Sequence, residues 1–134
     1  MRTIYLATPY SYRSKIPFLG KLVMAWRNRV VTKTAARIMK RGENVFSPIT
    51  HSHYIATIGN LPPLAHEFWL RLDKWYVDRA DLIYVLNQNG WEDSIGVQRE
   101  IRWGIEQDKQ VYLIDRSGSV IKPLFEYKNL DHWI

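Results

Sequence analysis

The chain has 134 residues, of which 46% are hydrophobic and 24% are charged, and it contains no cysteine. This length and balance predict a single globular domain and exclude a disordered tail, a collagen-like repeat and a coiled coil. The lack of cysteine excludes disulfides and cysteine nucleophiles, and no apolar run approaches the roughly 20 residues of a membrane helix. We therefore expect a cytoplasmic protein that does not bind membranes.

Charge is unevenly distributed along the chain. The 19 Lys and Arg residues exceed the 13 Asp and Glu residues, which gives a net charge of +6, and ten basic residues precede the first acid, Glu43. A basic balance favours anionic partners, which range from nucleic acid to a single phosphate ester. The 6 Trp, 8 Tyr and 4 Phe residues can fill a core and can also line a pocket for a flat ligand such as a nucleobase.

The first half of the chain predicts two strands separated by a helix. Residues 3–7 form an apolar run that ends before Pro9, which is typical of a buried strand. Residues 22–41 have helical periodicity, Gly42 follows them as a stop, and residues 44–47 predict a second strand. The inward side of the helix is expected to carry Val31, Ala35, Ile38 and Met39.

Two segments show no period. Residues 49–65 contain Gly59 and two prolines, and we predict a long loop, a kind of segment that is often functional. Beyond Asp115 the sequence predicts a turn-rich tail. The end of this tail, residues 130–134, is expected to pack or to face a partner.

The second half of the chain continues the alternation of strand and helix. Residues 66–79 predict a helix, residues 81–86 a strand buried on both faces, and residues 110–114 a fourth strand. Between the last two strands, Ser94 is placed to cap a third helix. The inward faces of the two helices are expected to carry Phe68, Leu72, Trp75 and Tyr76 in the first, and Val97, Ile101, Gly104 and Ile105 in the second.

This alternation predicts the fold class. Strands that alternate with helices in a short chain imply right-handed crossovers and a parallel sheet. We expect one α/β domain over residues 1–134, with a doubly wound, Rossmann or flavodoxin-like parallel sheet and helices on both of its faces. Ligands of such sheets bind beyond the carboxyl ends of the strands. These ends are expected at residues 7–11, 47–49, 86–96 and 114–119.

The loop before the third helix has the features of an anion site. Ser94 and Gly96 open the helix, whose free amides and positive dipole end favour a phosphate group. Glu100 lies a little over one turn further in, and a turn rises about 5.4 Å, which is comparable to the separation of a 5′-phosphate from the anomeric carbon. A carboxylate there could attack the sugar carbon, as retaining glycosidases do. The alternative interpretation is a Ser cap followed by a solvent-facing Glu.

Three segments carry a resemblance to a known family: Ile4-Tyr5-Leu6-Ala7, then Asp73 with Ala80-Asp81 after it, and Ser94-Ile95-Gly96-Val97-Gln98-Arg99-Glu100-Ile101. In their order and spacing, the chain resembles the nucleoside 2-deoxyribosyltransferase-like superfamily from about Ile4 to Ile114. The most similar branch contains the 2′-deoxynucleoside 5′-monophosphate N-glycosidases. The resemblance implies cleavage of an N-glycosidic bond, or deoxyribosyl transfer, on a nucleotide or nucleoside by a homo-oligomer.

The resemblance also implies roles for single residues. Glu100 corresponds to the nucleophile that attacks the anomeric carbon, Asp73 to an aspartate that assists proton transfer, and Tyr5 to a tyrosine that holds the glutamate. Ser94 corresponds to the serine that binds the 5′-phosphate in the monophosphate branch. Asp93 precedes it, and an acid near this position is typical of the transferases that act on free nucleosides, so both branches remain open.

Two further segments are candidates for substrate contacts. Ser11 and Arg13 follow the first strand and could hold phosphate, although a surface turn is equally compatible with them. His51 and His53 could contact the base or the phosphate, but residues 49–65 have no counterpart in the best-known members of the family. Paired histidines also bind metals, yet no acid stands at ligand spacing in this segment, so we expect no metal. We expect no organic cofactor either, because the carboxyl groups supply the chemistry.

The helix at residues 22–41 presents a basic stripe. At about 100° per residue, four of its basic side chains fall within about 80° of one another, on the side opposite the apolar residues. Arg27 lies outside this stripe. The stripe is either a solvated face or a surface for an anion or nucleic acid. Nucleic acid ranks last, because the chain lacks a known recognition motif, and a non-catalytic nucleotide-binding module on the same fold is the main alternative to an enzyme. The stripe consists of Arg29, Lys33, Arg37 and Lys40.

Overall fold

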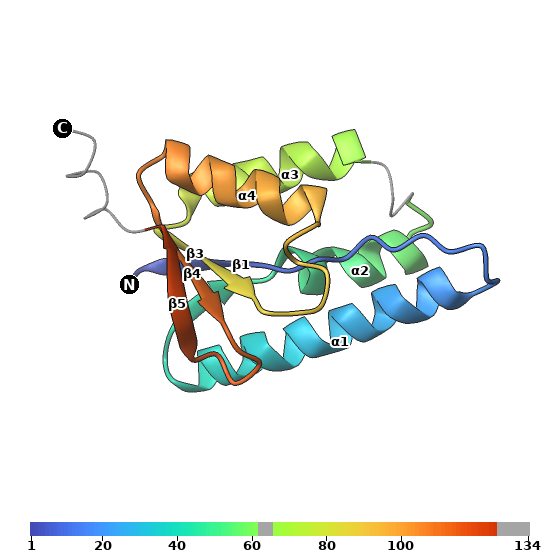
Figure 1. The fold of residues 1–134 in the computed structure, drawn as a ribbon, viewed down its shortest axis with the longest axis horizontal. Helices are drawn as coiled ribbons and strands as arrows, with labels where there is room; N and C mark the ends of the chain where they lie inside the picture. Colours follow the sequence, from blue (N-terminus) through green and yellow to red (C-terminus); the bar gives the residue numbers. More distant parts are fainter. Residues whose placement is uncertain (62–65, 126–134) are drawn as a thin grey trace.

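A computed structural model of the chain describes residues 1–61 and 66–125. This part forms a single α/β domain with helices on both sides of a sheet, as the sequence predicts (Figure 1). No helix in it is long and apolar enough to cross a membrane. The elements in chain order are β1 (Thr3–Ala7), α1 (Leu19–Lys40), β2 (Asn44–Phe46), α2 (Pro48–Ile58), α3 (His66–Arg79), β3 (Leu82–Leu86), α4 (Ile95–Glu106), β4 (Gln110–Ile114) and β5 (Val120–Phe125).

The sheet has five strands in the order β2-β1-β3-β4-β5. The first four are parallel, with Tyr5 of β1 aligned with Phe46 of β2 and with Ile83 of β3. This flavodoxin-like arrangement confirms the predicted fold class. The crossovers leave β1 and β3 side by side at the centre, where the order of the strands reverses. In sheets of this kind, ligands bind at such a reversal point.

The fifth strand adds an antiparallel edge to the predicted parallel sheet and corrects the prediction of a turn-rich tail beyond Asp115. β5 runs antiparallel to β4 and covers its free edge. The carboxylate of Asp115 accepts hydrogen bonds from the amides of Ser117 and Ser119, and Gly118 has a φ of +89°. The turn chemistry was visible in the sequence, but the exposed strand that follows the turn has no apolar alternation to reveal it. Residues 130–134 lie outside the described residues.

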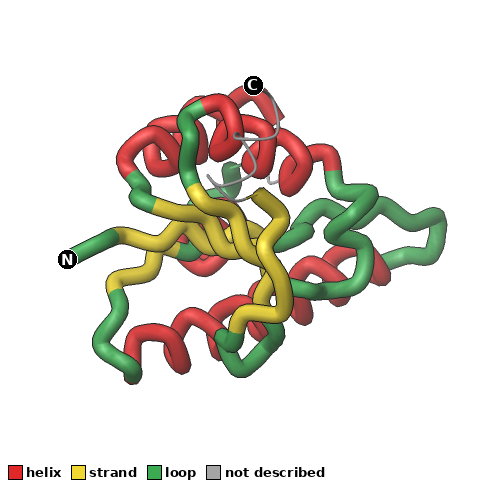
Figure 2. Tube along the Cα trace, turned by 60° about the vertical axis from the view of Figure 1, so that its left-hand side comes forward, coloured by secondary structure: helices red, strands yellow, loops and turns green. Residues whose placement is uncertain are grey.

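Two cores cover the two faces of the sheet. Side chains alternate along a strand, so Ile4 and Leu6 of β1 face α1, whereas Tyr5 and Ala7 face α3 and α4. Figure 2 shows α1 on one side of the sheet and the pair of α3 and α4 on the other. The polar hydroxyl of Tyr5 is thereby placed beneath the two helices that carry carboxyl groups toward the sheet.

The predicted loop over residues 49–65 is wrong for its first half, because residues 48–58 form α2. Ser47 caps this helix by accepting a hydrogen bond from the amide of Thr50, and Pro48 stands at its first position. α2 packs on α1 and on the end of β1. Its Ile55 and Ile58 are exposed, so the apolar residues of this segment do not follow one buried face of the helix. The sequence therefore lacks the apolar periodicity that indicates a helix.

The faces of the helices were predicted in part. In α1, Val31, Ala35 and Ile38 are buried as predicted, and the basic stripe is exposed. The prediction that Met39 faces inward is wrong, because 55% of its surface is exposed, and the polar Thr34 is buried instead. The Thr34 hydroxyl is satisfied by donating to the carbonyl of Arg116.

In α3 and α4, a carboxyl group lies on each inward face. Asp73 precedes the buried Val77 by one turn, and Glu100 lies between the buried Val97 and Gly104. Because the predicted faces followed apolar residues alone, they were rotated away from these acids. The predicted inward residues that the structure leaves exposed are Phe68, Trp75 and Ile105.

Candidate active site

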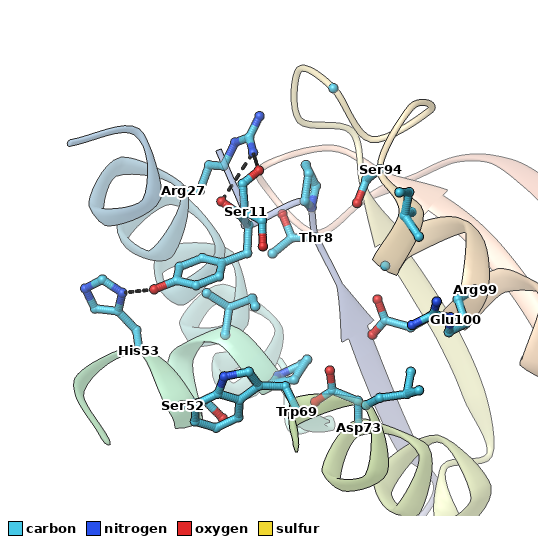
Figure 3. Close-up of a pocket in the computed structure, with 18 of the residues that line it drawn as sticks. Thr8, Ser11, Arg27, Ser52, His53, Trp69, Asp73, Ser94, Arg99 and Glu100 are labelled. Atoms are coloured by element: carbon cyan, nitrogen blue, oxygen red, sulfur yellow. Dashed lines mark hydrogen bonds between the residues drawn. The ribbon is translucent and has the colours of Figure 1, made fainter. Parts of the chain in front are cut away.

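A cavity of about 480 Å³ opens at the carboxyl ends of β1 and β3. Its walls come from the loop after β1, from α2 and α3, and from the first turns of α4 (Figure 3). The structure thus brings together side chains that are up to 95 residues apart in the chain, from Thr8 to Trp103. The predicted site residues that line this cavity are Ser11, Arg13, His53, Asp73, Asp93, Ser94, Gly96 and Glu100.

Glu100 is buried in the wall formed by α4, with 7% of its surface exposed. The alternative of a solvent-facing Glu is therefore wrong. Burial raises the pKa of its carboxyl group, and the negative charge of Asp73 raises it further. The Tyr5 hydroxyl and the Arg99 guanidinium act in the opposite direction and favour the ionised form.

Asp73 faces Glu100 across the cavity from α3 (Figure 3). Burial raises the pKa of its carboxyl group well above the usual range, and the two acids titrate as an interacting pair. Two carboxyl groups that repel each other in a desolvated site do not ionise together easily. Because both pKa values are raised, the pair retains at least one proton near neutral pH. With one proton bound, the cavity contains one carboxylic acid and one carboxylate.

Tyr5 lies behind the cavity wall rather than in it, and its side chain is fully buried. Burial raises the pKa of its phenol, and the charges of Glu100 and Asp73 raise it further. Within the part of the chain that the structure describes, its hydroxyl makes no hydrogen bond of standard geometry. A phenol that stays protonated beside Glu100 can donate a hydrogen bond to the carboxylate when Glu100 is ionised.

Ser94 forms the start of α4 at the cavity. Its hydroxyl accepts a hydrogen bond of 3.2 Å from the amide of Val97, so the predicted cap is confirmed. Ser94, Gly96 and the exposed Asp93 all line the cavity here. The serine hydroxyl can still donate its own proton to an anion while it accepts from Val97.

The opposite wall is held by a hydrogen bond between two rings. The Tyr10 hydroxyl and Nδ1 of His53 are 2.6 Å apart, which ties the loop after β1 to α2. Burial lowers the pKa of His53, which favours its neutral form. The structure does not bring His51 to the cavity; its ring packs against those of Phe46 and Tyr76.

Several lining residues were not found from the sequence. Arg27 of α1, Trp69 of α3, and Arg99 and Trp103 of α4 all face the cavity. For Arg27, the available signal was its position off the basic stripe. The two tryptophans gave no signal, since aromatic residues on a helix are usually core. Among the described residues, no group of three His, Asp or Glu side chains converges as metal ligands would.

The fold and the site define a flavodoxin-like α/β domain with a buried carboxyl pair at the reversal point of its sheet. The chain belongs to the family described as a domain of unknown function (DUF1937), whose model matches residues 2–116. No curated protein matches the chain.

Among solved structures, the chain is similar to a 2-deoxyribosyltransferase from the psychrotolerant bacterium Bacillus psychrosaccharolyticus. The two are 21% identical, with 90% of this chain and 77% of that chain covered, and the TM-score is 0.54. This likeness supports the architecture, that is, the strand order and the placement of the helices.

Proposed function

We propose that this protein cleaves the N-glycosidic bond of a nucleoside or nucleoside 5′-monophosphate, either by hydrolysis or by deoxyribosyl transfer. The observation that carries the proposal is the pair of carboxyl groups of the buried Glu100 and the partly buried Asp73, which share one cavity and whose pKa values are raised. The solved relative is a 2-deoxyribosyltransferase, which agrees with this chemistry. The resemblance of the Ser94 to Ile101 segment to the monophosphate N-glycosidases agrees with it as well.

In the proposed reaction, ionised Glu100 attacks the anomeric carbon and forms a glycosyl ester as the bond to the base breaks. Protonated Asp73 gives its proton to the leaving base. Tyr5 donates a hydrogen bond to Glu100 and orients it. Water then attacks the anomeric carbon, Asp73 takes up one of its protons, and Glu100 departs as carboxylate. In a transferase, a second base replaces the water. These steps require no metal or organic cofactor.

The start of α4 supports a phosphate-binding role. Ser94, Gly96 and the helix dipole favour an anion there, and Ser11 and Arg13 line the same cavity. Asp93 opposes a phosphate and could instead accept a hydrogen bond from a free 5′-hydroxyl. We propose that the 5′-monophosphate is the better substrate, because a dianion gains charge-assisted hydrogen bonds that a neutral sugar does not.

We also propose assembly as a homo-oligomer, which the family resemblance implies. Residues 130–134, which the sequence predicts to pack or to face a partner, lie outside the described residues. The alternative function is a nucleotide-binding module without catalysis, on the same fold. Binding and turnover have to be measured separately to distinguish these functions.

The deciding experiment is incubation with a panel of nucleosides and 5′-monophosphates, with chromatographic detection of free base. Glu100→Gln is the matched control, because the amide is nearly isosteric but not nucleophilic. We expect the wild type to release base and the variant to lose at least about 10³-fold in rate while it keeps its circular dichroism spectrum. Turnover by the variant at the wild-type rate would remove Glu100 from the mechanism. Nucleotide binding without any release would assign the chain to the non-catalytic class.

A further inference from the structure

Arg27 differs from the other basic residues of α1. Arg29 and the rest of the basic stripe are exposed, whereas Arg27 is half-buried and lines the cavity. Helix α1 therefore carries both exposed basic side chains and one half-buried guanidinium. The catalytic steps proposed above assign no role to Arg27.

The guanidinium of Arg27 connects two loops. Its Nη1 donates to the carbonyls of Tyr10 and Ser11, at 3.3 and 3.0 Å, and its Nη2 donates to the carbonyl of Asn89, at 3.3 Å. The first two carbonyls follow β1 and the third follows β3. Arg27 thus spans the reversal point of the sheet, where β1 and β3 diverge to their separate crossovers. Figure 3 shows it at the rim, next to Ser11.

Two local features fit this bridge. Gly90 has a φ of +93°, and a Cβ atom at this position would lie 3.1 Å from Nη2 of Arg27, so glycine lets the loop approach the guanidinium closely. Deeper in the same gap, the Thr8 hydroxyl donates to the side-chain carbonyl of Gln88 at 2.7 Å. The loops after β1 and β3 are therefore connected twice. The neutral hydrogen bond between Thr8 and Gln88 connects them in the interior, and the Arg27 guanidinium connects them at the rim of the cavity.

The charge of Arg27 is not neutralised by these contacts. All three acceptors are neutral backbone carbonyls, and within the described residues the ion pairs lie elsewhere, between Arg41 and Glu43 and between Lys74 and Asp78. Burial lowers the pKa of Arg27, as expected for a cation that has lost part of its hydration. A partly desolvated charge at a cavity rim attracts an anionic group of a ligand.

We propose that Arg27 is a positioning and specificity-determining residue, which holds the loops after β1 and β3 at a fixed separation and directs an anionic group of the substrate into the gap between them. The part that concerns substrate rests on the proposed nucleotide chemistry. The part that concerns the loops does not, because it follows from the three hydrogen bonds alone.

The test compares Arg27→Gln and Arg27→Lys with Arg29→Gln, a matched control two residues away on the exposed stripe. Two quantities are measured for each protein. Hydrogen–deuterium exchange is followed in peptides that cover residues 8–13 and 87–91. The ratio of kcat/KM for a 5′-monophosphate to that for its free nucleoside reports the response to the anion.

We expect Arg27→Gln to speed exchange in both loops and to lower the ratio, each by about tenfold or more, since charge-assisted hydrogen bonds are lost. Arg27→Lys should restore part of the ratio but not the slow exchange, because an ammonium cannot reproduce the planar fork that holds three carbonyls. Arg29→Gln should change neither quantity.

Unchanged exchange in both loops would overturn the bridging role. An equal loss for both substrates would overturn the specificity role, since a merely structural residue has that effect. If the wild type releases no base at all, the proposed function fails. The ratio is then replaced by calorimetric binding of the same two ligands, and failure of the wild type to bind the monophosphate overturns the specificity role.

Discussion

In the proposed reaction, Asp73 and Glu100 have opposite tasks although both are carboxylic acids. In water both would be ionised at neutral pH, since ordinary carboxyl groups titrate near about 4. In the cavity, burial of each group and their mutual repulsion raise both pKa values. With one proton shared by the pair, the site holds one acid and one carboxylate, which are the two groups that the proposed reaction requires.

Tyr5 and Asp73 should differ in how much they contribute to rate. Tyr5→Phe removes one hydrogen-bond donor beside Glu100, so we expect a moderate loss of kcat, about tenfold. Asp73→Asn removes the proton-transfer group, which typically contributes roughly 10²–10⁴-fold. Single-turnover rates on one nucleotide measure both. Wild-type rates in Asp73→Asn would show that α3 does not supply the acid.

The pH profile of kcat/KM should report the carboxyl pair. Because both pKa values are raised, the fully protonated pair persists to higher pH than ordinary carboxyl groups, and activity should rise only well above about pH 5. The negative charge of Asp73 raises the pKa of Glu100, so the pair loses its second proton only at high pH. Loss of that proton removes the acid and gives the wild type an alkaline limb. Asp73→Asn has no such acid to lose, so its residual activity should lack this limb. An alkaline limb that persists in the variant would mean that another group titrates.

At the level of elements, local signals predicted what depends on local chemistry. Ser94 stands at a helix start, and its cap and the position of Glu100 one turn later follow from short-range spacing. The inward face of α4 could not be placed correctly from apolar residues, because its middle position is an acid. The same holds for Asp73 in α3. Functional acids break the hydrophobic period that sequence analysis follows.

Other parts of the site depend on tertiary contacts that no local pattern records. α2 was missed because it covers α1 with only two fully buried side chains, those of Pro48 and Ala56. Arg27 approaches the cavity because α1 extends past the end of the sheet (Figure 1), and its acceptors lie up to 62 residues away. Contacts of this kind become visible only when β1 and β3 are placed side by side.

Two serine caps in this fold make a matched comparison. Ser47 caps α2 and Ser94 caps α4, each by accepting an amide hydrogen bond from the third residue of the helix. We expect Ser47→Ala and Ser94→Ala each to lower the free energy of unfolding by about 1 kcal/mol. Urea unfolding followed by circular dichroism measures this loss.

Ser47→Ala and Ser94→Ala should differ in their substrate specificity. Ser94→Ala also removes a donor to phosphate, so its preference for a 5′-monophosphate over the nucleoside should fall by about tenfold or more, and that of Ser47→Ala should not. If the preference falls equally in both variants, the effect comes from loss of the cap and not from a phosphate contact at Ser94.

At the scale of the whole molecule, the carboxyl pair of Glu100 and Asp73 should reduce stability at alkaline pH. The pKa of Glu100 is higher in the folded state than in the unfolded chain, so the folded state binds more protons between the two values. The free energy of unfolding therefore falls as pH rises from about 4 through the raised pKa, by about 1.4 kcal/mol for each pH unit that separates the folded and unfolded pKa values.

Glu100→Gln should remove the part of this dependence that Glu100 contributes, whereas the raised pKa of Asp73 contributes a part that remains. We expect the inactive variant to be as stable as the wild type near about pH 4.5 and more stable, by more than about 1 kcal/mol, near about pH 9. Urea titrations of both proteins at the two pH values measure the difference. A difference that stays constant with pH would show that Glu100 ionises as easily in the fold as in the unfolded chain.

The central place of β1 has a consequence for the order in which the chain folds. β1 is made first, but its pairing with β3 joins residues about 78 positions apart, as the bond from the Thr3 amide to Asp81 illustrates. At roughly 5–20 residues per second, several seconds of synthesis separate the two strands. During that time Ile4 and Leu6 lack the part of their core that β3 and β4 supply, which includes Leu82 and Ile114. The nascent chain can aggregate during this interval. Slower translation, or expression at a higher temperature, should therefore change the yield of folded protein more than its activity per molecule.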